Sequence, residues 1–154
     1  LNNYLLCAER VAMRKKQIFV SFDYDHDRRY KYLLEAWDAN PEFDFVFKDE
    51  TPGEINTYDI GRIKAGLTRK INDATHTLFI VGKHVNQPHK DRNAIGFINW
   101  INFEAYQSIQ SGNYLAVVKL DDSCTIPNEL RAKHSWISGF SEKNVLNVLN
   151  HSSK

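Results

Sequence analysis

A tryptophan and a glutamate one helical turn apart, Trp100 and Glu104, form the pattern in this sequence that most strongly indicates chemistry. They follow the apolar run from Thr77 to Val81, which is typical of a strand buried on both faces of a parallel sheet. Such strands end at the carboxyl edge of the sheet, where open α/β folds place their ligand sites. Glu104 is therefore a candidate catalytic carboxylate. Trp100 is either a surface on which a base stacks or, as is commoner for a large aromatic at a helix start, a packing residue.

The segments that must position these residues alternate between strand and helix patterns. Strands are predicted at 17–22, 43–47, 77–81 and 114–120, and helices from about Asp27 onward and over 60–71, 100–109 and 145–149. Alternation with short connections predicts an α/β fold with a mostly parallel central sheet, arranged as a flavodoxin-like three-layer α/β/α sandwich. The long polar stretch 84–98 is the exception, and we expect a surface excursion there that could act as a lid.

Length and composition limit the classes of protein that need to be considered. The 154 residues suit one domain over 16–154, preceded by an extension at 1–15. Twenty basic and nineteen acidic side chains give a net charge of +1, which argues against a nucleic-acid partner. The sequence contains no apolar run of about 20 residues, so neither a membrane span nor a membrane partner is expected and a cytoplasmic location is the default. Cys7 and Cys124 lie far apart and are interpreted as free thiols.

Several other chemistries are disfavoured by the pattern around their candidate residues. His84 and His89 near Asp91 lack the spacing of a metal site, and solvated loop histidines are the favoured interpretation. Ser21 is not in a Gly-x-Ser-x-Gly elbow, and the glycines form neither a dinucleotide fingerprint nor a P-loop. A phosphate-receiver domain would need an aspartate after the third strand, where this chain has Val81-Gly82-Lys83. No metal site is predicted.

Three segments carry a resemblance to a known family. Residues 18–22 are similar to a first strand that reads apolar, then Ser, then aromatic, and residues 48–53 are close to a basic-Asp-x-x-Pro-Gly turn called the BB loop. Trp100 and Glu104 match a Trp-x-x-x-Glu pattern on the helix after the third strand. From about Lys16 onward the chain resembles a TIR domain, specifically the TIR-like branch of bacterial signalling and anti-phage defence proteins such as those of Thoeris systems.

The resemblance implies an activity on NAD, which would be a substrate and not a resident cofactor. In enzymatic members of the family, the glutamate matching Glu104 is the catalytic residue that cleaves the nicotinamide glycosidic bond. A carboxylate near the ribose can stabilise the oxocarbenium-like state of such a cleavage or hold the ribose hydroxyls. One carboxylate can suffice because nicotinamide leaves as a neutral molecule. Attack by a hydroxyl of the same nucleotide would give a cyclic ADP-ribose isomer, a signal for a separate effector.

The same resemblance indicates which residues would line the NAD pocket. Ser21, Asp23 and Lys48 are expected at its edge, with Trp100 beside Glu104. Phe22 is expected to stack on nicotinamide or adenine, although plain core packing is an equal alternative. By charge alone, two further residues are possible partners of the diphosphate, namely Arg62 and Lys64.

Two other functions remain open at the level of sequence. The first is a non-catalytic module of signal transduction, in which TIR-like contacts join one copy of the chain to another or to a partner. The second is a nucleoside deoxyribosyltransferase-like enzyme, which shares the sheet topology and uses a carboxylate nucleophile. Self-association is expected in the enzymatic case as well, because TIR-like sites are often completed or switched on by a neighbouring subunit.

Overall fold

The computed structural model describes residues 16–40, 43–48, 57–131 and 136–154. The N-terminal extension at 1–15 and residues 49–53 of the Lys48 to Gly53 turn lie outside these residues. The elements in chain order are β1 (Lys16–Ser21), α2 (Tyr24–Asp38), β2 (Phe45–Lys48), α3 (Ile60–Asp73), β3 (His76–Val81), α4 (Arg92–Ile95), α5 (Trp100–Gln110), β4 (Tyr114–Lys119), the 3₁₀ turn η1 (Asn128–Leu130), β5 (Ile137–Ser138) and α6 (Glu142–Asn150).

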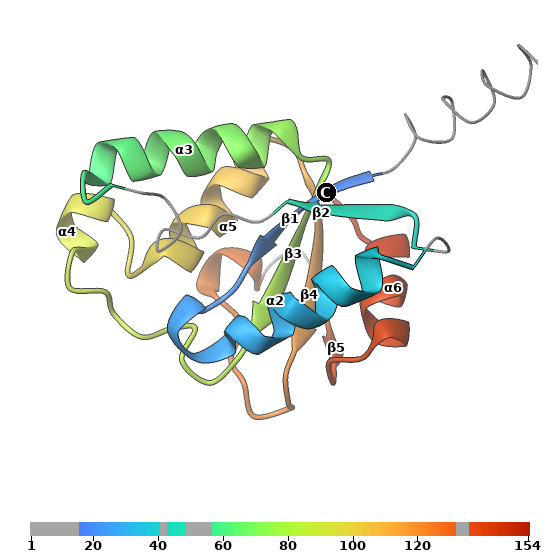
Figure 1. Cartoon of the computed structure of the whole chain (residues 1–154). Coiled ribbons are helices and arrows are strands. Elements are labelled where there is room, and N and C mark those ends of the chain that lie inside the picture. Colours follow the sequence, from blue (N-terminus) through green and yellow to red (C-terminus); the bar gives the residue numbers. More distant parts are fainter. Residues whose placement is uncertain (1–15, 41–42, 49–56, 132–135) are drawn as a thin grey trace, which may run out of the picture.

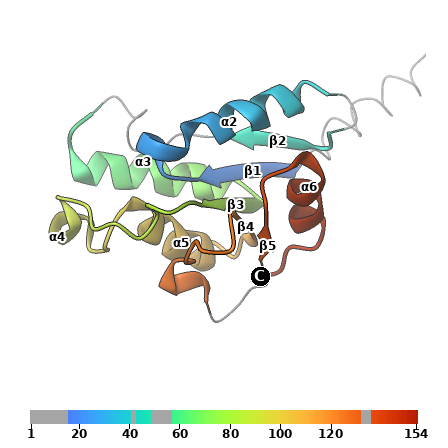
Figure 2. The ribbon, with the colours of Figure 1, turned by 90° about the horizontal axis from the view of Figure 1, so that it is seen from below.

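The sheet has five parallel strands in the order β2-β1-β3-β4-β5. Helices α2 and α6 cover one face, and α3 and α5 cover the other (Figures 1 and 2). The predicted three-layer, flavodoxin-like arrangement is confirmed. Since β1 leads outward to β2 and β3 leads the other way to β4, the strand order reverses between β1 and β3. In open α/β sheets, ligands bind at the carboxyl edge beside such a point.

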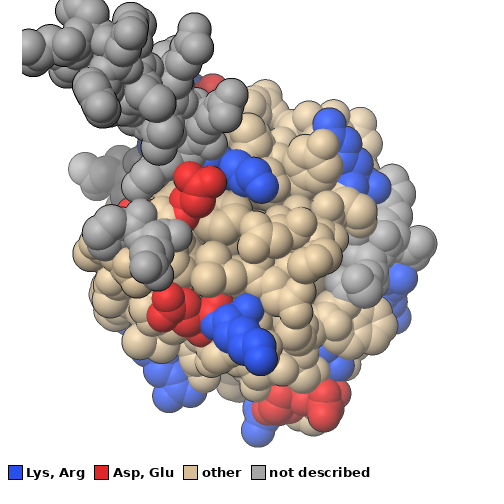
Figure 3. Space-filling model, turned by 90° about the vertical axis from the view of Figure 1, so that its right-hand side faces the viewer, with Lys and Arg blue, Asp and Glu red and all other residues tan. Residues whose placement is uncertain are grey.

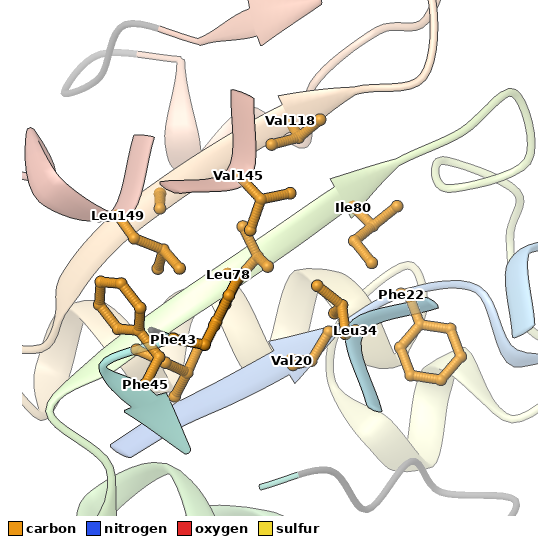
Figure 4. Packing of buried hydrophobic residues seen from close by; sticks show 12 residues of the cluster. Val20, Phe22, Leu34, Phe43, Phe45, Leu78, Ile80, Val118, Val145 and Leu149 are labelled. Atoms are coloured by element: carbon orange, nitrogen blue, oxygen red, sulfur yellow. The ribbon is translucent and has the colours of Figure 1, made fainter. Parts of the chain in front are cut away.

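Alternation along the central strands divides the core between the two faces. Val20 of β1 and Leu78 and Ile80 of β3 pack with Leu34 of α2 on one face, together with Val145 of α6 (Figure 4). The intervening residues of the same strands pack toward α3 and α5. Every residue of β3 is buried, as expected for a central parallel strand. The strands therefore present their carboxyl ends as one fixed edge.

The first helix begins earlier than the sequence indicates. It starts at Tyr24 and not near Asp27, because the Asp23 carboxylate accepts hydrogen bonds from the backbone N–H groups of Asp25 and His26 and so serves as the N-cap. Asp25 and Asp27 consequently lie in the first helical turn, where the helix dipole favours negative charge.

Two short elements were not predicted. Helix α4 is a single turn that ends at Gly96, whose φ of 82° favours glycine. Strand β5 has two residues, paired with Val118 and Lys119 of β4. Neither is long enough to produce a hydrophobic period in the sequence.

Neither acidic nor basic side chains dominate the face of the molecule that Figure 3 shows. Uncharged residues form a broad area there, and acidic and basic side chains lie in small groups around it (Figure 3). This agrees with the net charge of +1. None of the helices in the described part of the chain is long and apolar enough to cross a membrane.

Candidate active site

A pocket of about 770 Å³ lies at the carboxyl edge of the sheet, beside the reversal between β1 and β3. Its walls come from four places: the end of β1 with the start of α2, the start of α3, the segment after β3, and the start of α5. The volume falls in the range of roughly 300–1,000 Å³ that small-molecule sites occupy. The pocket is therefore large enough for a nucleotide.

Glu104 reaches this pocket from the second turn of α5. Asn99 caps the helix by accepting a hydrogen bond from the Asn102 backbone N–H at 3.0 Å. The helix is buried from Trp100 to Ala105, and Glu104 itself is 2% exposed. Its Oε2 accepts a hydrogen bond from the hydroxyl of Ser21, the last residue of β1. A strand end and a helix start thus fix a buried carboxyl group at the site.

Burial changes the acidity of this carboxyl group. Loss of solvation raises the pKa of Glu104 to about 8, and the hydrogen bond from Ser21 acts in the opposite direction. Near neutral pH the group is largely protonated. A cation placed beside it would favour the ionised form, because opposite charges close together lower the pKa of a carboxyl group. Glu104 is thus suited to a positively charged ligand or intermediate.

Asn99 also fixes the wall that follows β3. Its Nδ2 donates to the backbone oxygens of Val85 at 2.7 Å and Gln87 at 3.0 Å. Farther along, the His89 backbone N–H donates to the Ile98 oxygen at 2.7 Å. The first part of the predicted excursion at 84–98 is therefore tied to residues 98 and 99, directly before the Glu104 helix.

A second polar group lies on the α2 side of the pocket. The Asp23 carboxylate, besides capping α2, lies 3.0 Å from Nδ1 of His26. The His26 ring stacks on the ring of His84 with centroids 3.8 Å apart and planes 19° from parallel. Nδ1 of His84 is buried and has no hydrogen-bond partner within the described residues. Asp23, His26 and His84 all line the pocket.

Behind this group, Asp27 packs directly on the backbone at Gly82. Asp27 is 6% exposed, and its Oδ2 has no hydrogen-bond partner among the residues described. Burial, and then the charge of Asp23, raise its pKa. A Cβ atom at Gly82 would lie 2.3 Å from Asp27 Oδ2, a distance that real side chains do not show. A side chain at position 82 would therefore require the Asp27 carboxyl group to move.

Most of the site residues expected from the sequence come together. The same pocket is lined by Phe22, Asp23, Trp100 and Glu104. Ser21 does not line it but donates a hydrogen bond to Glu104. Phe22 and Trp100 are 3% and 8% exposed, so packing accounts for most of their surface.

Two of the three predicted basic residues do not line the described part of the pocket, and the third is not described in full. Lys48 ends β2, and its side chain is outside the described part of the structure. Arg62 and Lys64 are not among the described lining residues. The Lys64 ammonium group lies over the ring of Phe103, 5.6 Å from its centroid.

The loop histidines take no part in a recognisable metal site. Among the described residues, no three His, Cys, Asp or Glu side chains gather as metal ligands would. Nδ1 of His89 accepts a hydrogen bond from the Asp91 backbone N–H at 3.0 Å. His84, interpreted from the sequence as a solvated loop histidine, does lie in the loop after β3, but its ring stacks on His26 and its Nδ1 is buried.

Sequence reasoning missed Asn99, His26 and the contact between Asp27 and Gly82. Asn99 had a detectable signal, since Asn directly before an apolar helix is a common N-cap. The pairing of His26 with His84 joins residues 58 positions apart (84 − 26), and nothing local in the sequence indicates it.

Comparison with known proteins gives a matching family model and several solved structures of similar fold. Residues 19–125, more than half of the chain, match the family model described as Thoeris protein ThsB, TIR-like domain. The crystal structure of a prokaryotic SEFIR domain is similar with a TM-score of 0.56 and 12% identity, over 88% of this chain and 94% of that one. A 2-desoxiribosyltransferase from Leishmania mexicana is similar with a TM-score of 0.58 and 12% identity, over 88% and 98%. At this identity the likenesses concern the fold. No curated protein sequence matches the chain.

Proposed function

Because this chain belongs to the family of Thoeris ThsB TIR-like domains, we propose that it cleaves NAD to nicotinamide and a cyclic ADP-ribose type signal. In this proposal NAD is the substrate, and a separate effector senses the product. TIR-like contacts between copies of the chain would assemble or activate the site.

The observation that carries the proposal is the buried Glu104 carboxyl group in the pocket beside the strand-order reversal. Its 2% exposure and the hydrogen bond from Ser21 are unusual for a helix glutamate, since Glu is rarely buried without a specific role. A raised pKa in a pocket is typical of catalytic carboxyl groups.

The reaction begins with the bond between the ribose C1′ and the nicotinamide nitrogen. When this bond breaks, its electron pair moves to the nitrogen, which neutralises the charged pyridinium ring. Nicotinamide leaves without needing a proton, and positive charge develops at C1′. The ionised Glu104 stabilises that charge. A ribose hydroxyl of the same nucleotide then attacks C1′ to give a cyclic product, whereas water would give linear ADP-ribose.

The other walls suit the remaining parts of the nucleotide. Phe22 and Trp100 supply apolar surface for a base, and Asp23 supplies an acceptor for ribose hydroxyls. Among the described lining residues, Lys90 is the Lys or Arg side chain available to the diphosphate. Lys48 from β2 is a further proposed contact.

Incubation of concentrated protein with NAD, followed by chromatography with mass detection, tests the proposal. Nicotinamide together with a cyclic ADP-ribose isomer is the expected result. Formation of linear ADP-ribose would support cleavage of NAD but contradict the cyclisation step. Transfer between free nucleosides, without NAD cleavage, would indicate a deoxyribosyltransferase. If no substrate turns over, the interaction module replaces the enzyme as the better account.

A further inference from the structure

In the proposed reaction, the proton of the attacking hydroxyl needs an acceptor that has not yet been identified. The identity of this acceptor is inferred below and rests on the proposed function. The hydroxyl that attacks C1′ must lose its proton as the new bond forms. Glu104 is poorly suited to take it, because an ionised Glu104 that accepted the proton would lose the charge that stabilises the cation. A second titratable group in the pocket is needed.

Three imidazole side chains line the pocket: His26, His84 and His89. Imidazole is the side chain that exchanges protons most readily near neutral pH. Nδ1 of His89 already accepts a backbone hydrogen bond. Nδ1 of His84 is buried without a partner in the described structure, so no group orients that ring by hydrogen bonding.

His26 differs because a carboxylate holds it. Asp23 Oδ2 lies 3.0 Å from His26 Nδ1, and a carboxylate can only accept, so Nδ1 carries the proton of the neutral ring. Nε2 then has the free lone pair. This is the arrangement by which a carboxylate orients a histidine base and stabilises the imidazolium that forms.

Both partners are fixed in position. Asp23 Oδ1 accepts two backbone hydrogen bonds at the start of α2, and the His84 ring covers one face of His26 at 3.8 Å. The His26 side chain is nevertheless 44% exposed, so a ligand can reach it.

We propose that His26 is the proton acceptor of the transfer step, oriented by Asp23 and held by its stack with His84. As the hydroxyl oxygen forms its bond to C1′, the electrons of the O–H bond stay on oxygen and the proton moves to Nε2 of His26. The resulting imidazolium is stabilised by the Asp23 carboxylate and afterwards loses its proton to solvent.

Two nucleophiles separate this role from a structural one. A ribose hydroxyl or water must lose a proton when it attacks C1′, but 3-acetylpyridine attacks through a neutral nitrogen and loses none. Exchange of 3-acetylpyridine into NAD therefore needs Glu104 and not a proton acceptor. We expect His26→Gln to lower transfer to hydroxyl by about 100-fold or more, with base exchange within about threefold of the unmodified protein.

Matched variants sharpen the test. Asp23→Asn keeps an N-cap acceptor and removes the carboxylate from His26. It should lower both reactions through the proposed ribose contact and lower transfer to hydroxyl further than base exchange. His151→Gln replaces an exposed histidine after α6, outside the pocket, and should change neither reaction. Melting temperatures of all variants are measured alongside.

Each result decides the proposal. Selective loss of hydroxyl transfer in His26→Gln supports it. Equal loss of both reactions assigns His26 a structural role and overturns it, as does no loss at all. Glu104→Gln should lose both reactions. If the unmodified protein releases no nicotinamide, the proposed function fails first and this inference fails with it.

Discussion

Ser21 at the end of β1 donates its hydroxyl to the Glu104 carboxyl group on α5, across 83 positions of sequence. The contact joins the strand beside the order reversal to the helix that carries the candidate catalytic residue. It also stabilises the ionised form of a group whose burial favours the neutral form. The activity and the stability of the protein should therefore both depend on pH through this pair.

The pH dependence of kcat/KM should follow Glu104. Since the ionised form stabilises the ribosyl cation, kcat/KM for NAD should rise with pH and level off above the pKa of about 8. Ser21→Ala removes the interaction that lowers this pKa, so the midpoint should move to higher pH. A midpoint that stays in place in Ser21→Ala, or activity that falls from pH 6 to 8, would contradict this role.

Glu104→Gln should stabilise the protein, and more so at high pH. The folded-state pKa lies above the ordinary value of 4.5, so between pH 4.5 and about 8 the native state binds more protons than the unfolded state. The free energy of unfolding then falls as pH rises through this window. Glutamine does not titrate, so the variant does not lose free energy of unfolding in this way. Each unit by which the pKa is raised corresponds to a loss of about 1.4 kcal/mol. Melting curves at pH 4.5 and pH 8.5 measure the difference, and an equal effect at both would contradict burial as the cause.

Gly82→Ala should destabilise the protein because its Cβ would meet the Asp27 carboxyl group. Forcing a methyl group into a closed contact costs roughly 1–3 kcal/mol. Asp27→Ala in the same chain should recover much of the loss, whereas Asp27→Asn, which keeps the volume, should not. Urea unfolding of the unmodified protein, of Gly82→Ala, of Asp27→Ala and of the double variant gives the coupling energy. If the effects of Gly82→Ala and Asp27→Ala on stability are additive, the added methyl group does not clash with the Asp27 carboxyl group.

Asn99→Asp should loosen the pocket wall without removing the helix cap. The aspartate keeps the oxygen that accepts from Asn102, but it replaces the Nδ2 donor with an oxygen facing the carbonyls of Val85 and Gln87. We expect a loss of about 1–3 kcal/mol in stability. KM for NAD should rise more than kcat falls, because the pocket wall contributes to NAD binding whereas Glu104 acts in the bond-breaking step. Asn99→Ser, a cap without the repulsion, should be milder, and a KM unchanged in both variants would count against the wall's role.

The sequence was sufficient for the fold because the strands are short runs of apolar and β-branched residues separated by helical patterns. Leu78 and Ile80 illustrate this, since a run buried on both faces indicates a central parallel strand wherever it occurs. Short elements such as β5 could not be predicted, because two residues carry no period and are paired only through tertiary contact.

The site was predictable where a side chain is part of a local motif. Glu104 and Asp23 could be proposed from their positions after strands, and both line the pocket. Contacts between distant residues could not be predicted. Ser21 was expected at the pocket edge, but its hydrogen bond to Glu104 was not, nor were the contacts of Asp27 with Gly82 and of His84 with His26. Asn99 combines both situations. Its role as N-cap is local and could be predicted, whereas its hydrogen bonds to Val85 and Gln87 join distant residues and could not.

The most direct test of the account is nicotinamide release from NAD at saturating concentration, by the unmodified protein and by Glu104→Gln, at high protein concentration and pH 8.5. We predict release by the first and a loss of about 100-fold or more in the second, whose fold should be intact and at least as stable. Equal release by both proteins would contradict the assignment of Glu104. Absence of release from both would contradict the enzymatic account as a whole.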